Sequence, residues 1–198
     1  MIIGETYRKI REGKGISISS LAGAEISKSQ ISRFELGETE ISFFKLLYLL
    51  EKIGVTLEEF LLSCNNYQPS DFNTLIRLVQ QAAYNQEIKS LLNMVSKEME
   101  LFRETKSHYH KLNAIFIESI IYGIDNTHQL SNQDTSYLTN YLFSVENWGY
   151  YEILILGNCC RAILPNLLFR YAKEALKKGK LYSSIPRNKQ ALVQLLLN

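Results

Sequence analysis

The sequence is poor in residues that interrupt helices, and it has no long apolar run. Three prolines and ten glycines among 198 residues exclude a collagen-like or linker-dominated chain. No stretch reaches roughly 18 uninterrupted apolar residues, so we expect no membrane span. The opening residues, MIIGETYRKI, contain no apolar run ahead of a cleavage site, so we expect no signal peptide.

Cysteine is also scarce. Cys64, Cys159 and Cys160 form an odd set with one adjacent pair, which does not build a disulfide framework. We therefore expect reduced thiols in a cytoplasmic protein.

Motifs for catalysis are missing as well. The chain has no G-x-S-x-G, no Walker-type glycine loop and no C-x-x-C. His108 and His110 are two residues apart, so they do not share a helix face, and no acid or cysteine is placed to join them. The sequence predicts a protein that is not an enzyme and that carries neither a cofactor nor a metal ion.

What the sequence does contain is the pattern of an all-α protein. Hydrophobic residues make up 46% and charged residues 21%, as in an ordinary globular protein. Alternating β-branched runs between hairpin turns are absent, whereas apolar residues recur at helical spacing. The longer predicted helices cover residues 4–13, 41–53, 57–63, 72–84, 87–105, 108–124, 135–146, 150–164, 166–178 and 187 onward.

Capping residues predict further helix ends. Ser17 is a candidate N-cap for a short helix that carries Leu21 and Ala22. Ser27 is a candidate N-cap for a helix that stops at Gly37, and Gln30 follows it at the spacing of a capping box. Thr56 is a candidate cap for the helix at 57–63.

The segment 64–71, CNNYQPSD, interrupts the helices and marks a boundary. We expect a first domain at residues 1–64, a linker at 65–70 and a second domain at 71–198. In the second domain the predicted helices come in pairs that repeat about every 40 residues, which is typical of a TPR-like helical-repeat array.

The first domain has the organisation of a helix-turn-helix protein, with five short helices in about 60 residues and a short turn between the second and third. The segment from Arg8 to Arg33 has a local charge of +4. Inward-facing Ile31 and Phe34 leave a polar face on the third helix, and this is the face that enters a DNA major groove in such domains. It carries Lys28, Ser29, Ser32 and Arg33, with Ser27 and Gln30 completing the predicted contacts.

Phosphate contacts are expected from the first two helices, because hydroxyls, cationic side chains and helix N-termini bind phosphate oxygens. The candidates are Ser17, Ser19, Arg8, Arg11 and Lys14. The charge of +7 over residues 160–198 is the other basic concentration of the chain.

The N-terminal residues resemble a known family. YRKIR at 7–11, LA at 21–22, SKSQISRFE at 27–35 and Gly37 are similar to the lambda-repressor-type (Xre) DNA-binding domain. More narrowly, GETYRKIR, ISKSQISRFELGE and ISFFKLL resemble the Rgg/GadR/MutR regulators of Gram-positive bacteria. The resemblance also implies that Arg11 pairs with Glu35 to hold the domain together.

This resemblance implies a cytoplasmic, homodimeric transcription regulator that binds double-stranded DNA. The helical-repeat domain of the family forms the dimer and binds short peptide pheromones, which implies a quorum-sensing role and a short hydrophobic peptide as partner. Polar side chains in otherwise apolar helices are the candidate peptide contacts, because an extended peptide needs amide partners for its backbone. They are Asn113, Asn140, Asn158 and Arg161.

Family members generally have a longer repeat domain than the residues after 70 supply, so we expect an incomplete array. Two alternatives stay open. The protein is either a plain repressor whose repeats only dimerise, or a shortened regulator that pairs with a longer paralogue. The second alternative would use the apolar segment at residues 191–197, ALVQLLL.

Overall fold

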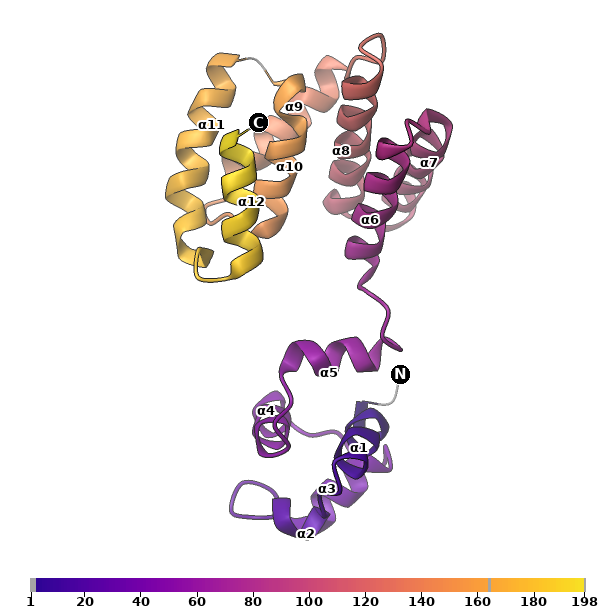
Figure 1. The fold of residues 1–198 in the computed structure, drawn as a ribbon, viewed down its shortest axis with the longest axis vertical. Helices are drawn as coiled ribbons and strands as arrows, with labels where there is room; N and C mark the ends of the chain where they lie inside the picture. Colours follow the sequence, from indigo (N-terminus) through magenta and orange to yellow (C-terminus); the bar gives the residue numbers. More distant parts are fainter. Residues whose placement is uncertain (1–2, 164, 198) are drawn as a thin grey trace. The chain divides into compact units, whose positions relative to one another are not determined.

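A computed structural model describes residues 3–163 and 165–197, and every regular element in this part of the chain is a helix (Figure 1). The chain divides into two compact units, Met1–Ile76 and Arg77–Asn198. The outermost positions of the predicted domains, residues 1 and 198, lie outside the described residues. No helix in the described part is long and apolar enough to cross a membrane.

The N-terminal unit begins with five helices whose ends follow the predicted caps. They are α1 (Ile3–Gly13), α2 (Ile18–Leu21), α3 (Lys28–Glu35), α4 (Phe43–Lys52) and α5 (Leu57–Cys64). Ser17, Ser27 and Thr56 each cap a helix as expected, and Ser42, which the sequence reading missed, caps α4. Gly37 follows α3 with φ of 73°, a left-handed conformation that suits glycine.

Two local expectations are corrected. Ala22 lies one residue beyond α2, at its C-cap, because its backbone is already extended. Ser27 caps α3 through the backbone N–H of Gln30, but the Gln30 side chain does not return to complete a capping box. Its amide oxygen instead accepts a hydrogen bond from Lys45.

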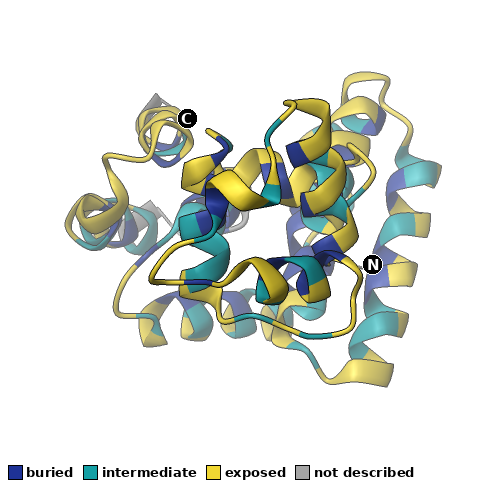
Figure 2. Ribbon diagram, turned by 90° about the horizontal axis from the view of Figure 1, so that it is seen from below, coloured by how far each residue is buried: buried dark blue, intermediate teal, exposed yellow. Residues whose placement is uncertain are grey.

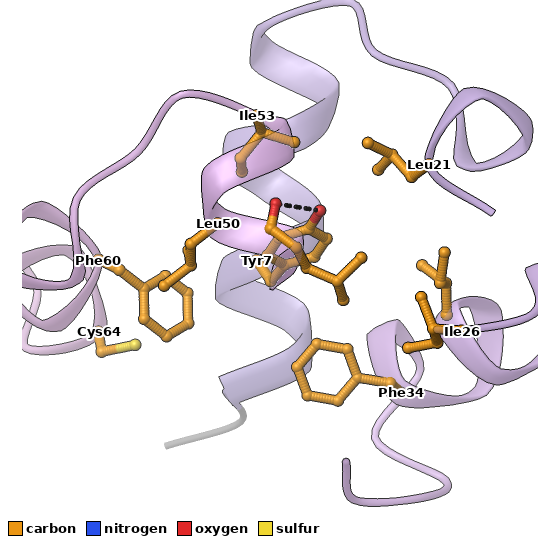
Figure 3. Packing of buried hydrophobic residues seen from close by; sticks show 10 residues of the cluster. Tyr7, Leu21, Ile26, Phe34, Leu50, Ile53, Phe60 and Cys64 are labelled. Carbon is orange, nitrogen blue, oxygen red and sulfur yellow. Dashed lines mark hydrogen bonds between the residues drawn. The ribbon is translucent and has the colours of Figure 1, made fainter. Parts of the chain in front are cut away.

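The core of this unit is built around Tyr7 of α1 (Figure 3). Tyr7 is fully buried, and its hydroxyl donates to the Leu49 carbonyl at 3.3 Å, so the one polar atom of the ring is satisfied. Its ring lies 6.0 Å from that of Phe34. Ile31 of α3 and Phe60 of α5 are buried in the same cluster, so apolar side chains from helices across the unit fix the position of α3.

Helix α1 approaches the end of α3 very closely at Gly4. A Cβ atom at this position would lie 1.8 Å from the Phe34 carbonyl oxygen. Only glycine therefore permits this contact between the two backbones.

The remaining helices lie close to the predicted ranges, and the helix predicted at 135–146 differs by starting three residues and ending two residues earlier than predicted. They are α6 (Asp71–Tyr84), α7 (Ile88–Thr105), α8 (His108–Ile124), α9 (Asn132–Ser144), α10 (Tyr150–Cys159), α11 (Pro165–Lys178) and α12 (Pro186–Leu197). The helix predicted at 150–164 ends earlier than expected, because α10 passes into a 3-10 turn, η1 (Cys160–Ala162). A second 3-10 turn, η2 (Gly179–Tyr182), follows α11. The end of the prediction, residue 164, is outside the described residues.

In the C-terminal unit α8 packs against α7 and α10, and α12 packs back on α10. Gly157 of α10 faces Leu195 of α12 in the second contact, where a Cβ would lie 3.8 Å from the Leu195 Cα, an ordinary van der Waals distance. Buried and exposed positions alternate along single helices, as amphipathic helices around a core require (Figure 2).

Trp148 anchors the region between α9 and α11. Its side chain is fully buried and stacks against Tyr171 at a centroid distance of 6.4 Å. The Lys178 ammonium lies 5.5 Å from the indole centroid and donates to the Val145 carbonyl. A cation–π contact and a hydrogen bond therefore close the cluster on one side.

Candidate nucleic-acid interface

Helices α2 and α3 with the turn between them form the helix-turn-helix. The turn is held by a hydrogen bond from the Gly23 N–H to the Ile26 carbonyl at 3.0 Å. Ile26 is buried within the core cluster and anchors the turn from below. The start of α3 is thereby fixed by both backbone and core contacts.

The polar face of α3 is directed to solvent. Lys28, Ser29 and Arg33 are exposed, and Ser32 is half-buried. Arg33 lies 3.5 Å from Glu38, but both side chains remain more than half exposed, so this contact is weak. Two cationic groups and two hydroxyls are therefore available on a single helix surface.

The first turn of α3 also carries Ser27 and Gln30. The Ser27 hydroxyl accepts from the Gln30 N–H at 3.2 Å and lies 3.3 Å from the Ser29 hydroxyl. Gln30 is half-buried, and its Oε1 accepts from the Lys45 ammonium at 3.0 Å. Ser27 is committed to capping, whereas the amide NH2 of Gln30 keeps its donors.

Side chains on and after α1 and around α2 present further hydrogen-bond donors. Ser17 caps α2, and Ser19 is exposed in its first turn. Arg8 donates to Glu12 at 2.9 Å on the exposed side of α1, and this bond lowers the pKa of the Glu12 carboxyl. Lys14 reaches the Gly54 carbonyl at 3.4 Å. At the surface, Arg8 and Lys14 each carry a positive charge, and Ser19 carries a hydroxyl that takes no part in the cap. The Ser17 hydroxyl is engaged in the cap of α2.

Arg11 has a different environment. It is 6% exposed, and its Nε and Nη2 donate to the two carboxylate oxygens of Glu35 at 2.6 and 2.7 Å. Its Nη1 donates to the Ile16 carbonyl at 2.6 Å. Such a bidentate pair fixes α1 to the end of α3.

The C-terminal unit has adjoining cavities along α8, α10 and α12. A cavity of about 320 Å³ is lined by residues of α8, α10 and η1, including Asn158 and Arg161. Asn158 also lines a second cavity, of about 510 Å³, between α10 and α12. Arg161 also lines a third cavity, of about 620 Å³, at the end of α8. Two of the four candidate peptide contacts therefore line one series of cavities.

The other two candidates lie elsewhere. Asn113 is buried, donates to Glu98 of α7 at 3.0 Å and accepts from Tyr151 of α10 at 3.0 Å. His110 also bonds Glu98, at 2.8 Å. Asn140 is exposed on α9 and lines none of these three cavities.

Comparison with known proteins accounts for both units. A helix-turn-helix family model matches residues 8–60, and the model described as HTH-type transcriptional regulator Rgg, C-terminal domain, matches residues 89–198. The crystal structure of the SHP pheromone receptor Rgg2 of Streptococcus dysgalactiae is 38% identical, with a TM-score of 0.78, and the match covers 98% of this chain and 67% of that one. The chain belongs to the Rgg family of transcriptional regulators.

Two further structures agree with this assignment. A cysteine-to-serine variant of the same receptor is 38% identical, with a TM-score of 0.80 over 98% of this chain and 68% of that one. A transcriptional regulator from Listeria monocytogenes, described as putative, is 18% identical with a TM-score of 0.81 over 98% of this chain and 66% of that one, which supports the fold alone. The Rgg-family chain thus spans about two-thirds of the length of these structures.

The Rgg family consists of DNA-binding transcription regulators, not of enzymes, and the predicted family and all-α fold are confirmed. Sequence reasoning missed Lys45 of α4, which lies outside the helix-turn-helix and contacts Gln30 of α3. Ser42, three residues before it, caps α4 and was the available signal, because a cap at that position puts residue 45 in the first turn of α4.

Proposed function

We propose that this Rgg-family chain binds specific DNA sequences as a homodimer and that a short hydrophobic peptide regulates it. The observation that supports the DNA part is the exposed face of α3, where the side chains of Lys28, Ser29 and Arg33 reach the surface above a buried core. Arg and Lys donate to guanine O6 and N7, and serine can serve either base type. Dimerisation brings two such helices to one operator and supplies specificity.

The proposed contacts fall into three groups by environment. Lys28, Ser29, Ser32, Arg33 and Gln30 read base edges, because they lie on the outer side of α3. Phosphate contacts come from Ser17, Ser19, Ser27, Arg8 and Lys14, which lie at the caps of α2 and α3, in α2, and on or just after α1. Arg11 contributes indirectly by holding α3 in place, because its donors are already engaged by Glu35 and Ile16.

The test is fluorescence-anisotropy binding to duplexes from upstream of the protein's own and neighbouring genes, at several salt concentrations. The variant is Lys28→Ala/Arg33→Ala. A matched control, Lys52→Ala/Lys89→Ala, removes the same charge at two exposed positions outside the proposed interface. We expect selective binding by the wild type and the control and loss of selectivity in the variant, with helicity by circular dichroism unchanged in all three.

Equal binding by variant and control on every duplex would contradict the assignment of α3 as the recognition helix. Sedimentation of the same preparations gives the oligomeric state. A monomer at concentrations where DNA is bound selectively would contradict the homodimer.

The peptide part is supported by the cavities that Asn158 and Arg161 line, together with the similarity to a pheromone receptor. An extended apolar peptide needs apolar walls and a few amide or cationic partners, and the cavity between α10 and α12 places Ile153 and Leu154 beside Asn158. We expect a fluorescent, apolar octapeptide library to yield binders whose affinity falls in Asn158→Ala and Arg161→Ala. Asn113 and Asn140 remain candidate contacts, tested by the same substitutions.

A second candidate function follows from the exposed side of α12. Leu195 packs on α10, but Val193 and Leu196 are each 50% exposed. The protein could pair with a longer paralogue through these side chains. Co-purification with such a paralogue, lost in Val193→Asp/Leu196→Asp, would favour this function over peptide sensing.

A further inference from the structure

Lys45 of α4 contacts the first turn of α3 from outside the helix-turn-helix. The Ser42 side chain accepts from the Lys45 N–H at 3.3 Å and caps α4 at this point. The Lys45 side chain then donates from Nζ to Gln30 Oε1 at 3.0 Å. Both side chains are half-buried, so the contact is partly shielded from water.

Gln30 is held in an unusual way for its position. At three residues after the N-cap, a glutamine commonly turns back to the cap residue's N–H. Here the cap is made by the Ser27 hydroxyl and the Gln30 backbone alone, while the Gln30 side chain is directed to Lys45. One lone pair of the amide oxygen is therefore engaged by a cation before any DNA binds, whereas the two N–H donors of the amide NH2 are left for recognition.

The orientation of this amide decides which base it can read. Glutamine recognises adenine by accepting from N6 with its oxygen and donating to N7 with its NH2. When Oε1 is bound to a lysine ammonium, Gln30 is favoured as a donor through its NH2 group. Guanine offers two acceptors to such a donor, O6 and N7, whereas adenine offers one acceptor and one donor. We propose that Lys45 is a positioning residue that sets Gln30 as a donor, so that the half-site base facing Gln30 is guanine in preference to adenine. This inference rests on the proposed role of α3 as the recognition helix.

The test compares base preference, which a purely structural or phosphate-binding role of Lys45 would not change. The proteins are the full-length wild type, Lys45→Met, Gln30→Ala and the double variant. Lys52→Met is the matched control, because it removes the same charge from the other end of α4. Each is titrated against duplexes that carry all four base pairs, one position at a time, within the selected operator.

We expect the wild type and Lys52→Met to prefer guanine over adenine at one half-site position. In Lys45→Met this ratio should fall by about fivefold or more, the lower range for a good bidentate contact, or reverse towards adenine. Gln30→Ala should flatten the preference at the same position, and adding Lys45→Met to it should change nothing further. An equal loss of affinity for every duplex in Lys45→Met, with the preference intact, would overturn the proposal.

A measurement without DNA separates this proposal from the proposed function. The side-chain amide signals of Gln30 in the NMR spectrum of the free protein should shift in Lys45→Met and stay in place in Lys52→Met, with the other signals of the core unchanged. Unchanged Gln30 signals in Lys45→Met would overturn the contact itself. A wild type with no base preference at any position, by contrast, would refute the recognition role of α3 and with it the reading of guanine.

Discussion

At the scale of single residues, the N-terminal unit depends on a charged pair that is removed from water. Arg11 and Glu35 are 6% and 3% exposed and are joined by two short hydrogen bonds. Removing one member of such a pair leaves the other charge buried and unpaired.

We expect Arg11→Met to lower the free energy of unfolding by about 3–5 kcal/mol. The double variant Arg11→Met/Glu35→Met should recover a large part of that loss, because no unpaired charge remains. Arg8→Met is the control and should leave the unfolding midpoint nearly unchanged, since Arg8 and Glu12 are both solvent-exposed. Urea unfolding followed by circular dichroism measures all four, and a double variant less stable than Arg11→Met would contradict this explanation.

Glycine at position 4 provides a second test at this scale. Gly4→Ala would put a Cβ atom 1.8 Å from the Phe34 carbonyl oxygen, so α1 and α3 must separate. We expect destabilisation of about 1–3 kcal/mol or more, as for overpacking in a core. Gly13→Ala in the same helix meets no atom within 4 Å and should be neutral or stabilising by up to about 1 kcal/mol. Thermal unfolding compares the two, and equal midpoints would show that the close approach is not a constraint.

The contacts of a residue could be predicted from the sequence when its partners are near it in the chain. The caps at Ser17, Ser27 and Thr56 bind atoms within three residues, and the sequence alone identified them. Lys45 and Gln30 are 15 residues apart on different helices, so their contact follows only from how α3 and α4 pack. The pairing of Arg11 with Glu35 was available from the family resemblance and not from the spacing.

At the scale of elements, α5 begins with a complete capping box. The Thr56 N–H and hydroxyl both donate to Glu59 at 2.8 Å, and the Glu59 N–H donates back to the Thr56 hydroxyl at 3.2 Å. The bonds from the Thr56 backbone and side chain lower the pKa of the Glu59 carboxyl.

A lowered pKa in the folded state means that the capping bonds contribute to stability above the carboxyl's unfolded pKa of about 4.3 and are lost as pH falls through the folded value. We expect the stability difference between wild type and Glu59→Gln to narrow below about pH 4. An NMR titration should give a Glu59 midpoint below its ordinary value, and Thr56→Val should raise that midpoint. An identical midpoint in Thr56→Val would contradict the role of the hydroxyl.

Most helices were predictable because their ends carry local signals, and α8 at His108–Ile124 matches its predicted range in full. The end of α10 was not, since Cys159 and Cys160 carry no stop signal and the helix tightens there into η1. That change of helix type places Arg161 at the edge of the cavities on α8 and α10. The series of cavities likewise depends on residues from α6, α8, α10, η1 and α12, which no local pattern brings together.

At the scale of the whole molecule, each unit has its own buried residues, which predicts that each can stay folded when the chain is cut. The predicted linker at 65–70 is almost entirely exposed, and Asn66 and Tyr67 have positive φ values of 50° and 59°. We expect brief chymotrypsin treatment to cleave after Tyr67 and leave two resistant fragments. Mass spectrometry of the fragments identifies the cleavage site. A first cut within α6, where the first compact unit ends at Ile76, would place the domain boundary there instead.

The position of Trp148 has a spectroscopic consequence. It is the single tryptophan of the chain and is buried in the C-terminal unit beside Lys178, whereas the N-terminal unit carries tyrosines and phenylalanines but no tryptophan. Excitation at the red edge of the aromatic absorption band therefore excites Trp148 alone. We expect unfolding of the helix-turn-helix by itself to leave the tryptophan emission unchanged. The unlabelled protein thus carries its own optical probe in the unit where a peptide is proposed to bind.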